Sequence, residues 1–135
     1  MIIIDALAGI ENPSILAVPL PEPHRLYLFA GGAIVDFGTT GPQKRDAFCF
    51  PLRCADGSCF ALEGTERVEG GIVHVSLGGF ERSDRGDHML SVHAAAIDRI
   101  DNALWIRTEL DVRADSGRAS ILCVGYYVAV LSTVT

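Results

Sequence analysis

Apolar and polar side chains alternate most regularly between residues 104 and 113 of the chain. One set of alternate positions is apolar except for a threonine: Leu104, Ile106, Thr108, Leu110 and Val112. The other set is mostly charged and also contains the single tryptophan: Trp105, Arg107, Glu109, Asp111 and Arg113. Because successive side chains of a β-strand point to opposite faces, this period of two predicts a strand with one buried face and one solvent-facing face.

Short apolar stretches separated by turn residues recur from residue 25 to the end of the sequence. Examples are RLYLFA and AIVDFG on either side of a glycine pair, IVHVSL, and MLSVHAAAI. The alanines of residues 91–101 are compatible with a helix, but Val92 and Ile97 favour a strand, and we assign a strand. Strands do not alternate with helices here, so we predict an all-β fold, an antiparallel β-sandwich or barrel, with residues 25–135 as one domain.

Residues 1–24 have a different composition and are predicted to form an extended N-terminal arm. Prolines at positions 13, 19, 21 and 23 disfavour a helix and a complete ladder of strand hydrogen bonds, because proline lacks a backbone N–H. The segment is nevertheless apolar enough to need covering, and its candidate interface side chains are Ile15, Leu16, Val18 and Leu20. Such an arm either reaches onto a neighbouring subunit or lies as an edge segment against its own domain.

The last apolar stretch, residues 120–131, is apolar on both of its alternating faces. One face contains Ile121, Cys123, Gly125, Tyr127, Ala129 and Leu131, and the other contains Leu122, Val124, Tyr126, Val128 and Val130. A strand of this kind has to be covered on both sides. Its own core covers one side, and a partner, the arm or a second internal layer covers the other. The candidate interface residues of this strand are Leu122, Val124, Tyr126 and Val128.

The composition indicates an oligomer and excludes several classes of protein. Apolar residues make up 49% of the chain and charged residues only 21%, which is too apolar for a disordered chain and more than one small core can hide. The net charge of −6 and the absence of a run of Lys or Arg argue against a nucleic-acid partner. No stretch resembles a secretory signal or a membrane span, so we expect a soluble protein made in a reducing cytosol, with no membrane partner.

Three of the four cysteines lie in the stretch CFPLRCADGSCFAL. Asp56-Gly57 is a favoured two-residue hairpin turn, which would place Cys54 opposite Cys59 and turn Cys49 to the other face. Zinc usually takes four ligands, and this hairpin offers two cysteines on one face with no histidine nearby. A disulfide across the strands would be strained and would be reduced in the cytosol. We therefore expect a hairpin with packed thiols, no metal and no cofactor.

No catalytic group of residues can be assembled from the sequence. Nucleophile elbows, phosphate-binding glycine loops, the His-Glu-x-x-His motif and Cys-His pairs are absent, and the four histidines are dispersed. We therefore do not expect an enzyme. The tripeptide Arg85-Gly86-Asp87 is interpreted as a solvated turn. Trp105 is a candidate platform for stacking against a sugar.

The C-terminal third, HMLSVHAAAIDRIDNALWIRTELDVRADSGRASILCVGYYVAVLS, resembles the closing strands of small β-sandwich proteins in the virions of tailed phages. It is also similar to H-type lectin domains, in its long hairpin that ends on an aromatic-rich strand. The phage resemblance implies a decoration (cement) or tail-associated subunit of a virion, made in the host cytoplasm. Such a subunit would form a homo-oligomer and bridge neighbouring capsid or tail proteins. The alternatives are a carbohydrate-binding module, with Trp105 at the sugar, and a small acidic inhibitor of a host protein.

Overall fold

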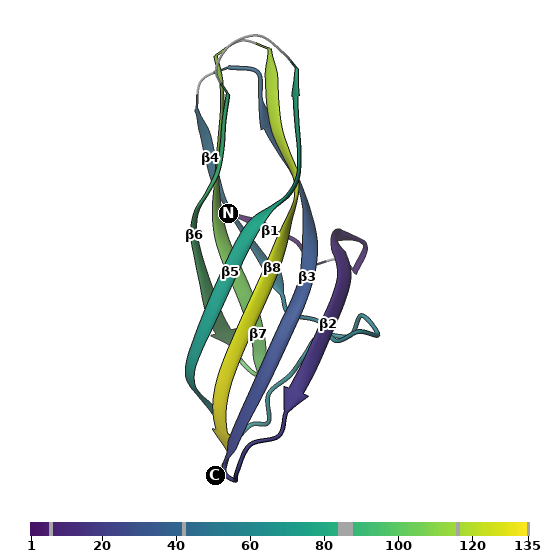
Figure 1. Cartoon of the computed structure of the whole chain (residues 1–135), viewed down its shortest axis with the longest axis vertical. Coiled ribbons are helices and arrows are strands. Elements are labelled where there is room, and N and C mark those ends of the chain that lie inside the picture. The colour runs from purple at the N-terminus through teal and green to yellow at the C-terminus, as the bar shows by residue number, and fades with distance from the viewer. Residues whose placement is uncertain (6, 42, 84–87, 116, 135) are drawn as a thin grey trace.

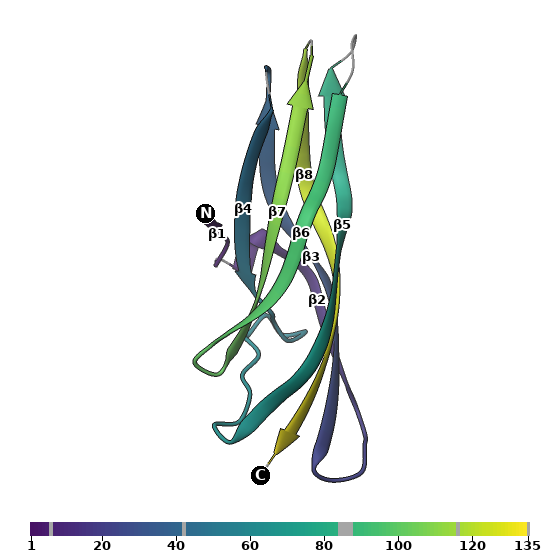
Figure 2. The same ribbon diagram turned by 90° about the vertical axis from the view of Figure 1, so that its left-hand side faces the viewer.

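The chain folds into a sandwich of two four-stranded sheets, which confirms the predicted fold class. The computed structural model describes residues 1–5, 7–41, 43–83, 88–115 and 117–134. The tripeptide Arg85-Gly86-Asp87 lies outside the described residues. Each sheet ends in two edge strands, so the structure is an open sandwich and not a closed barrel. Figures 1 and 2 show the two layers along an elongated molecule.

The first sheet has the strand order β1-β4-β7-β6. Its strands are β1 (Ile2–Ile3), β4 (Lys44–Pro51), β7 (Ala103–Ala114) and β6 (His88–Ile100). β1 runs parallel to β4, and the other neighbours are antiparallel. The alternation along β7 is confirmed by its buried residues, which include Leu104, Ile106, Thr108, Leu110 and Val112. The alanine-rich segment forms β6, so its assignment as a strand is also confirmed.

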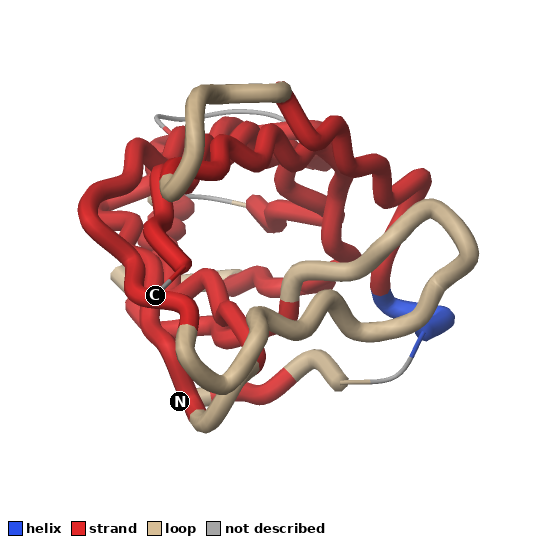
Figure 3. The backbone as a smooth tube through the Cα atoms, turned by 90° about the horizontal axis from the view of Figure 1, so that it is seen from below, coloured by secondary structure: helices blue, strands red, loops and turns tan. Residues whose placement is uncertain are grey.

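The second sheet has the order β2-β3-β8-β5 and contains the longest strands. Its strands are β2 (Ile10–Val18), β3 (His24–Thr39), β8 (Arg118–Val134) and β5 (Glu66–Ser83). All neighbours are antiparallel, and β8 lies between β3 and β5. A short 3-10 helix, η1 (Leu7–Gly9), leads into β2 and lies at one side of the two layers in Figure 3. The last strand of the described chain is therefore a central strand of its sheet.

The core fills the space between the sheets, and one face of β8 forms its centre. Val124, Tyr126 and Val128 are at most 3% exposed, and the ring of Tyr126 lies 5.6 Å from that of Phe50 on β4. Gly31 on β3 makes room for this tyrosine, because a Cβ atom there would come within 2.6 Å of the hydroxyl oxygen. Burial raises the pKa of Tyr126 to about 12. These three residues were predicted as an interface, and the structure corrects this, because they pack inside their own domain.

The N-terminal segment belongs to both sheets and does not form a free arm. β1 pairs with β4, and β2 is the edge strand beside β3. Pro13 falls at an irregularity in the β2–β3 pairing, where an edge strand tolerates a residue without an N–H. The other three prolines of the segment lie in residues 19–23, the connection between β2 and β3. This corrects the predicted arm over residues 1–24 and agrees with the alternative, an edge segment of the same domain.

The cysteine hairpin is present, but its register differs by one residue from the prediction. The amide of Gly57 donates to the carbonyl of Cys54 at 2.9 Å, and the amide of Cys54 donates to the carbonyl of Ser58 at 2.8 Å. Gly57 has a φ of 89°, so it adopts the left-handed conformation that follows the turn in three-residue hairpin loops. Cys59 consequently pairs with Arg53 and is exposed, whereas Cys54 packs against the core. The two cysteines therefore do not face one another as predicted.

The thiols are expected to be replaceable. All four cysteines are free, and burial raises the thiol pKa of Cys49 and Cys123, which makes them less reactive. The double substitution Cys54→Ser/Cys59→Ser should lower the free energy of unfolding by about 1 kcal/mol, through lost packing of Cys54. Urea unfolding with and without dithiothreitol measures this. A wild-type midpoint that falls on reduction would show that two of the cysteines form a disulfide.

Candidate functional site

The side of the second sheet that points away from the core forms a broad apolar surface, which we call the outer face. Strand register arranges its side chains in rows across β2, β3, β8 and β5. The three lower rows are Val18-Leu26-Leu131-Gly70, Leu16-Leu28-Ala129-Ile72 and Ser14-Ala30-Tyr127-His74. The fourth row is Glu11-Gly32-Gly125-Ser76. Figure 1 looks onto this face, with the lower rows towards the C-terminal end of β8.

The large side chains of the outer face are open to solvent. Ile72 is 72% exposed, Tyr127 66% and Leu16 60%. The residues of the three lower rows, all of them described, include no Asp, Glu, Lys or Arg, and Glu11 stands at the sheet edge in the fourth row. Removal of apolar surface from water is favourable by about 25 cal/mol per Å². A contiguous apolar patch of this kind on a folded protein marks an interaction surface.

Two hollows interrupt the outer face. A trough of about 430 Å³ lies over the fourth row, where Gly32, Gly78 and Gly125 leave the backbone uncovered. Ser76 also lines this trough, and Tyr127 stands at its border. A second hollow of about 270 Å³ lies lower on the face, over β3, β8 and β5. The outer face therefore has both protruding side chains and recesses that could receive them.

The structure places the remaining predicted interface residues in different surroundings. Leu16 and Val18 belong to the outer face, where they pair with residues of β3. Ile15, between them, points inward and packs against the core. Leu20 lies in the connection after β2 and is 36% exposed, and Leu122 on β8 is exposed to the same extent. The predicted set is therefore brought together only in part.

Sequence reasoning misses four large exposed residues of the outer face, which are Leu28, Ile72, Tyr127 and Leu131. Tyr127 lies on the other face of β8 from the residues that the sequence favoured. Ile72 lies on β5, where the alternate positions Gly70, Ile72, His74 and Ser76 carry no acidic or basic side chain other than the histidine. This uncharged alternation was the signal in the sequence from which the outer face of β5 could have been found.

The outward side of the first sheet has the opposite character. Trp105 lies there, partly buried, between residues of β4 and β6. On the same side Arg45 donates to the carboxylate of Asp111 at 3.0 Å. Burial raises the pKa of Asp111, but the hydrogen bonds from Arg45 and Gln43 outweigh it, so the pKa is lowered and the carboxylate is ionised at neutral pH. This side resembles a solvent-facing surface, and a sugar-stacking role for Trp105 stays a prediction.

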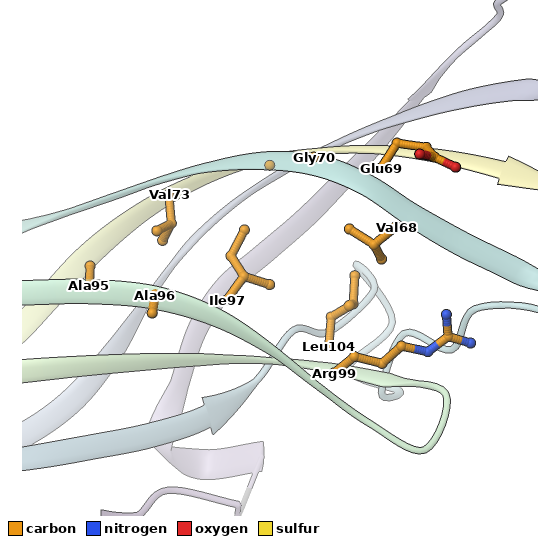
Figure 4. Close-up of a pocket in the computed structure, with 10 residues that line it drawn as sticks. Val68, Glu69, Gly70, Val73, Ala95, Ala96, Ile97, Arg99 and Leu104 are labelled. Carbon is orange, nitrogen blue, oxygen red and sulfur yellow. The ribbon is translucent and has the colours of Figure 1, made fainter.

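A further opening of about 490 Å³ lies between the edges of β5 and β6. Figure 4 shows Val73 from β5 and Ile97 from β6 pointing into it, with Arg99 at one end. Arg99 donates to the backbone carbonyls of Asp101 at 2.9 Å and of Glu66, so its charge is already engaged. The described residues that line the opening include no Ser, Cys, His or Lys. The lining does include Glu69, which accepts a hydrogen bond from the Thr133 hydroxyl at 2.7 Å, so the opening combines apolar walls with one carboxylate and one guanidinium.

A buried carboxylate closes the lower end of the sandwich. Glu66 is 2% exposed and accepts hydrogen bonds from the Tyr27 hydroxyl at 2.8 Å, from Ser132 and from the amide of Glu63 at 3.1 Å. Arg25 lies 3.8 Å from the same carboxylate. Burial raises the pKa of Glu66, but these hydrogen bonds outweigh it, and the pKa is lowered. Because every oxygen has a partner, the group ties β3, β5 and β8 together and has a structural role.

The outer face is therefore taken as the candidate site. Among the described residues, no three His, Cys, Asp or Glu side chains lie close enough together to hold a metal ion. The described part of the chain also forms no helix long and apolar enough to cross a membrane. Comparisons of the chain with protein-family models, with curated proteins and with solved structures found no match.

Proposed function

We propose that the protein is a non-enzymatic structural subunit that assembles with copies of itself by burying the outer face. The observation that supports this most directly is the uncharged apolar surface of the three lower rows, on a chain with a net charge of −6. Four strands about 4.8 Å apart and four rows about 6.8 Å apart cover roughly 500 Å². Two such faces together bury about 1,000 Å², the lower bound for a specific protein interface.

In this proposal the assembly is a virion, and the protein is a decoration (cement) or tail-associated subunit beside capsid or tail proteins. The support is the resemblance of residues 88–132, which form β6, β7 and most of β8, to the closing strands of small virion proteins. Because the N-terminal segment is part of its own sheets, the outer face makes the bridging contacts in place of an arm. A contact of modest area is sufficient there, since repetition in a shell multiplies its effect.

Light scattering of the purified protein tests the proposal. At micromolar concentration we expect a species of at least two 14.5 kDa copies, which shifts towards 14.5 kDa on dilution. Added salt should strengthen the association, because it screens the repulsion between copies of like net charge while the interface itself has no charge pairs to weaken. A folded protein that stays at 14.5 kDa at every concentration would contradict the proposal.

A further inference from the structure

The outer face divides into a half with protruding side chains and a half with a hollow. Tyr127, Ile72 and Leu16 protrude from the lower rows. One row higher, the trough of about 430 Å³ lies over Gly32 and Gly125. Tyr127 and Gly125 are two residues apart on β8, so they lie about 6.8 Å apart on one surface. A protrusion beside a hollow of this kind can fit a second copy of the same surface.

No described side chain of the protein fills the trough. A Cβ atom added to Gly125 would lie 3.6 Å from the Ser76 hydroxyl and 3.9 Å from the Gly31 carbonyl oxygen, which are ordinary contacts. Backbone and small side chains form much of its wall, and the polar side chains of Glu11, Asn12 and Ser76 line it as well. Glycine in a strand often marks a place where another group approaches the backbone closely. Such a recess offers a flat aromatic ring exposed backbone to lie on and polar groups near its hydroxyl.

We propose that two copies pack face to face about a two-fold axis that crosses β8 between Gly125 and Tyr127, so that Tyr127 of each copy enters the trough of the other. This inference rests on the proposed function and identifies the partner as a second copy of the chain. The axis lies in the plane of the interface, at right angles to β8, and it therefore exchanges positions 125 and 127. Each tyrosine ring then lies on the partner's Gly125, and the same contact is made twice.

The same axis accounts for further features of the outer face. On β5 it brings Ile72 over the partner's Gly78, which lines the same trough. In this arrangement the tyrosine hydroxyl lies beside the partner's Ser76, which is the neighbour of Gly125 across the sheet. A buried tyrosine hydroxyl usually requires a hydrogen-bond partner of this kind. An aromatic residue in a recess near the centre of the buried area is also the usual arrangement of an interface hot spot. With the axis between the third and fourth rows, these two rows of each copy cover one another, and the two lower rows lie over the partner's strands beyond the fourth row.

Sedimentation equilibrium of three variants tests this arrangement. Tyr127→Ala removes the ring and Gly125→Leu fills the trough, and each change is expected to weaken the dimer at least tenfold. The double variant Tyr127→Ala/Gly125→Leu exchanges the protrusion and the hollow, so it should regain most of the lost affinity. Tyr127 is 66% exposed and Gly125 has no positive φ, so both positions can accept these side chains in the folded monomer. Gly64→Leu, in open space before β5, is the control and should leave the dimer unchanged.

The outcomes separate this inference from the proposed function. If the wild type assembles and neither single variant changes the dissociation constant, the two-fold arrangement is wrong. It is equally overturned by a double variant that binds no more tightly than the weaker single variant. In both cases the proposal that the protein assembles with copies of itself is not contradicted. A wild type that stays at 14.5 kDa contradicts both the proposed function and this inference. Circular dichroism spectra that match the wild type establish that each variant is folded.

Discussion

Replacement of Ile72 by glutamate is expected to convert the assembled protein into a folded 14.5 kDa monomer. Ile72 is 72% exposed and lies in the second row of the outer face, so the change should not disturb the core. In the assembly the new carboxylate would lose its water, and the described rows beside it contain no Lys or Arg to pair with it. We expect the dissociation constant to rise about a hundredfold or more, because an unpaired buried charge costs several kcal/mol. Light scattering measures the change.

Ala96→Glu is the matched control for this experiment. Ala96 is exposed on the outward side of the first sheet, in register with Arg107 on β7. It adds the same charge to the chain but leaves the outer face unchanged, so assembly should persist. If both variants dissociate equally, net charge is responsible and not the outer face. An Ile72→Glu protein that remains assembled would place the interface elsewhere.

Replacement of Glu66 by alanine is expected to lower the free energy of unfolding by about 3–5 kcal/mol. The change would leave the hydroxyls of Tyr27 and Ser132 and the amide of Glu63 without their acceptor. It would also open a cavity where the second sheet is joined. Small domains are stable by only about 5–15 kcal/mol, so this is a large share of the total. Urea unfolding at neutral pH measures it, and a loss below about 1 kcal/mol would contradict the structural role of the carboxylate.

Acid should remove part of the same stabilisation from the wild type. The pKa of Glu66 in the folded protein is lower than its ordinary value of 4.5, because hydrogen bonds from Ser132 and Tyr27 outweigh the opposing effect of burial. The stabilisation is therefore fully present above pH 4.5 and is lost as the pH falls through the folded pKa. Glu66→Gln keeps the shape but takes up no proton, so its stability should fall less with acid. Equal acid dependence of the two proteins would show that Glu66 does not titrate in this way.

The first sheet was largely predictable because its strands have two different faces. In β7, the buried residues Leu104 and Ile106 alternate with the half-buried Trp105 and the exposed Arg107. The apolar side chains therefore face the core, and the others face the solvent side. In β6, the β-branched residues Val92 and Ile97 indicated a strand against the helix preference of the alanines. A pattern with one polar face determines both the type of element and the side that is buried.

The second sheet shows why the rest could not be predicted. β8 is apolar on both faces, so a period of two identifies the faces without showing which one is the core. Partner strands decide it: Tyr126 is buried where Gly31 of β3 leaves room for its ring. The wrong register predicted for the cysteine hairpin has a related cause. One left-handed glycine at position 57 shifts the register and turns Cys59 away from Cys54.

The candidate site depends on register over long distances in the sequence. The trough exists because Gly32 of β3 and Gly125 of β8 are direct neighbours across the sheet, although more than ninety residues separate them along the chain. Ile72 and Leu16 share a row only through the two strands between them. Pattern within one strand can identify exposed apolar residues, but only the pairing of strands shows that they form one surface.

The position of β8 also has a consequence for how the protein is made in the cell. Its neighbours β3 and β5 leave the ribosome earlier, and neither has its hydrogen-bonded partner on that side until residues 118–134 follow. During translation both strands present unpaired backbone, together with apolar side chains such as Phe29 and Val75 that are later buried. These are the features that favour aggregation and chaperone binding. A premature stop codon before residue 118 would therefore yield an aggregation-prone chain, because the second sheet lacks its central strand.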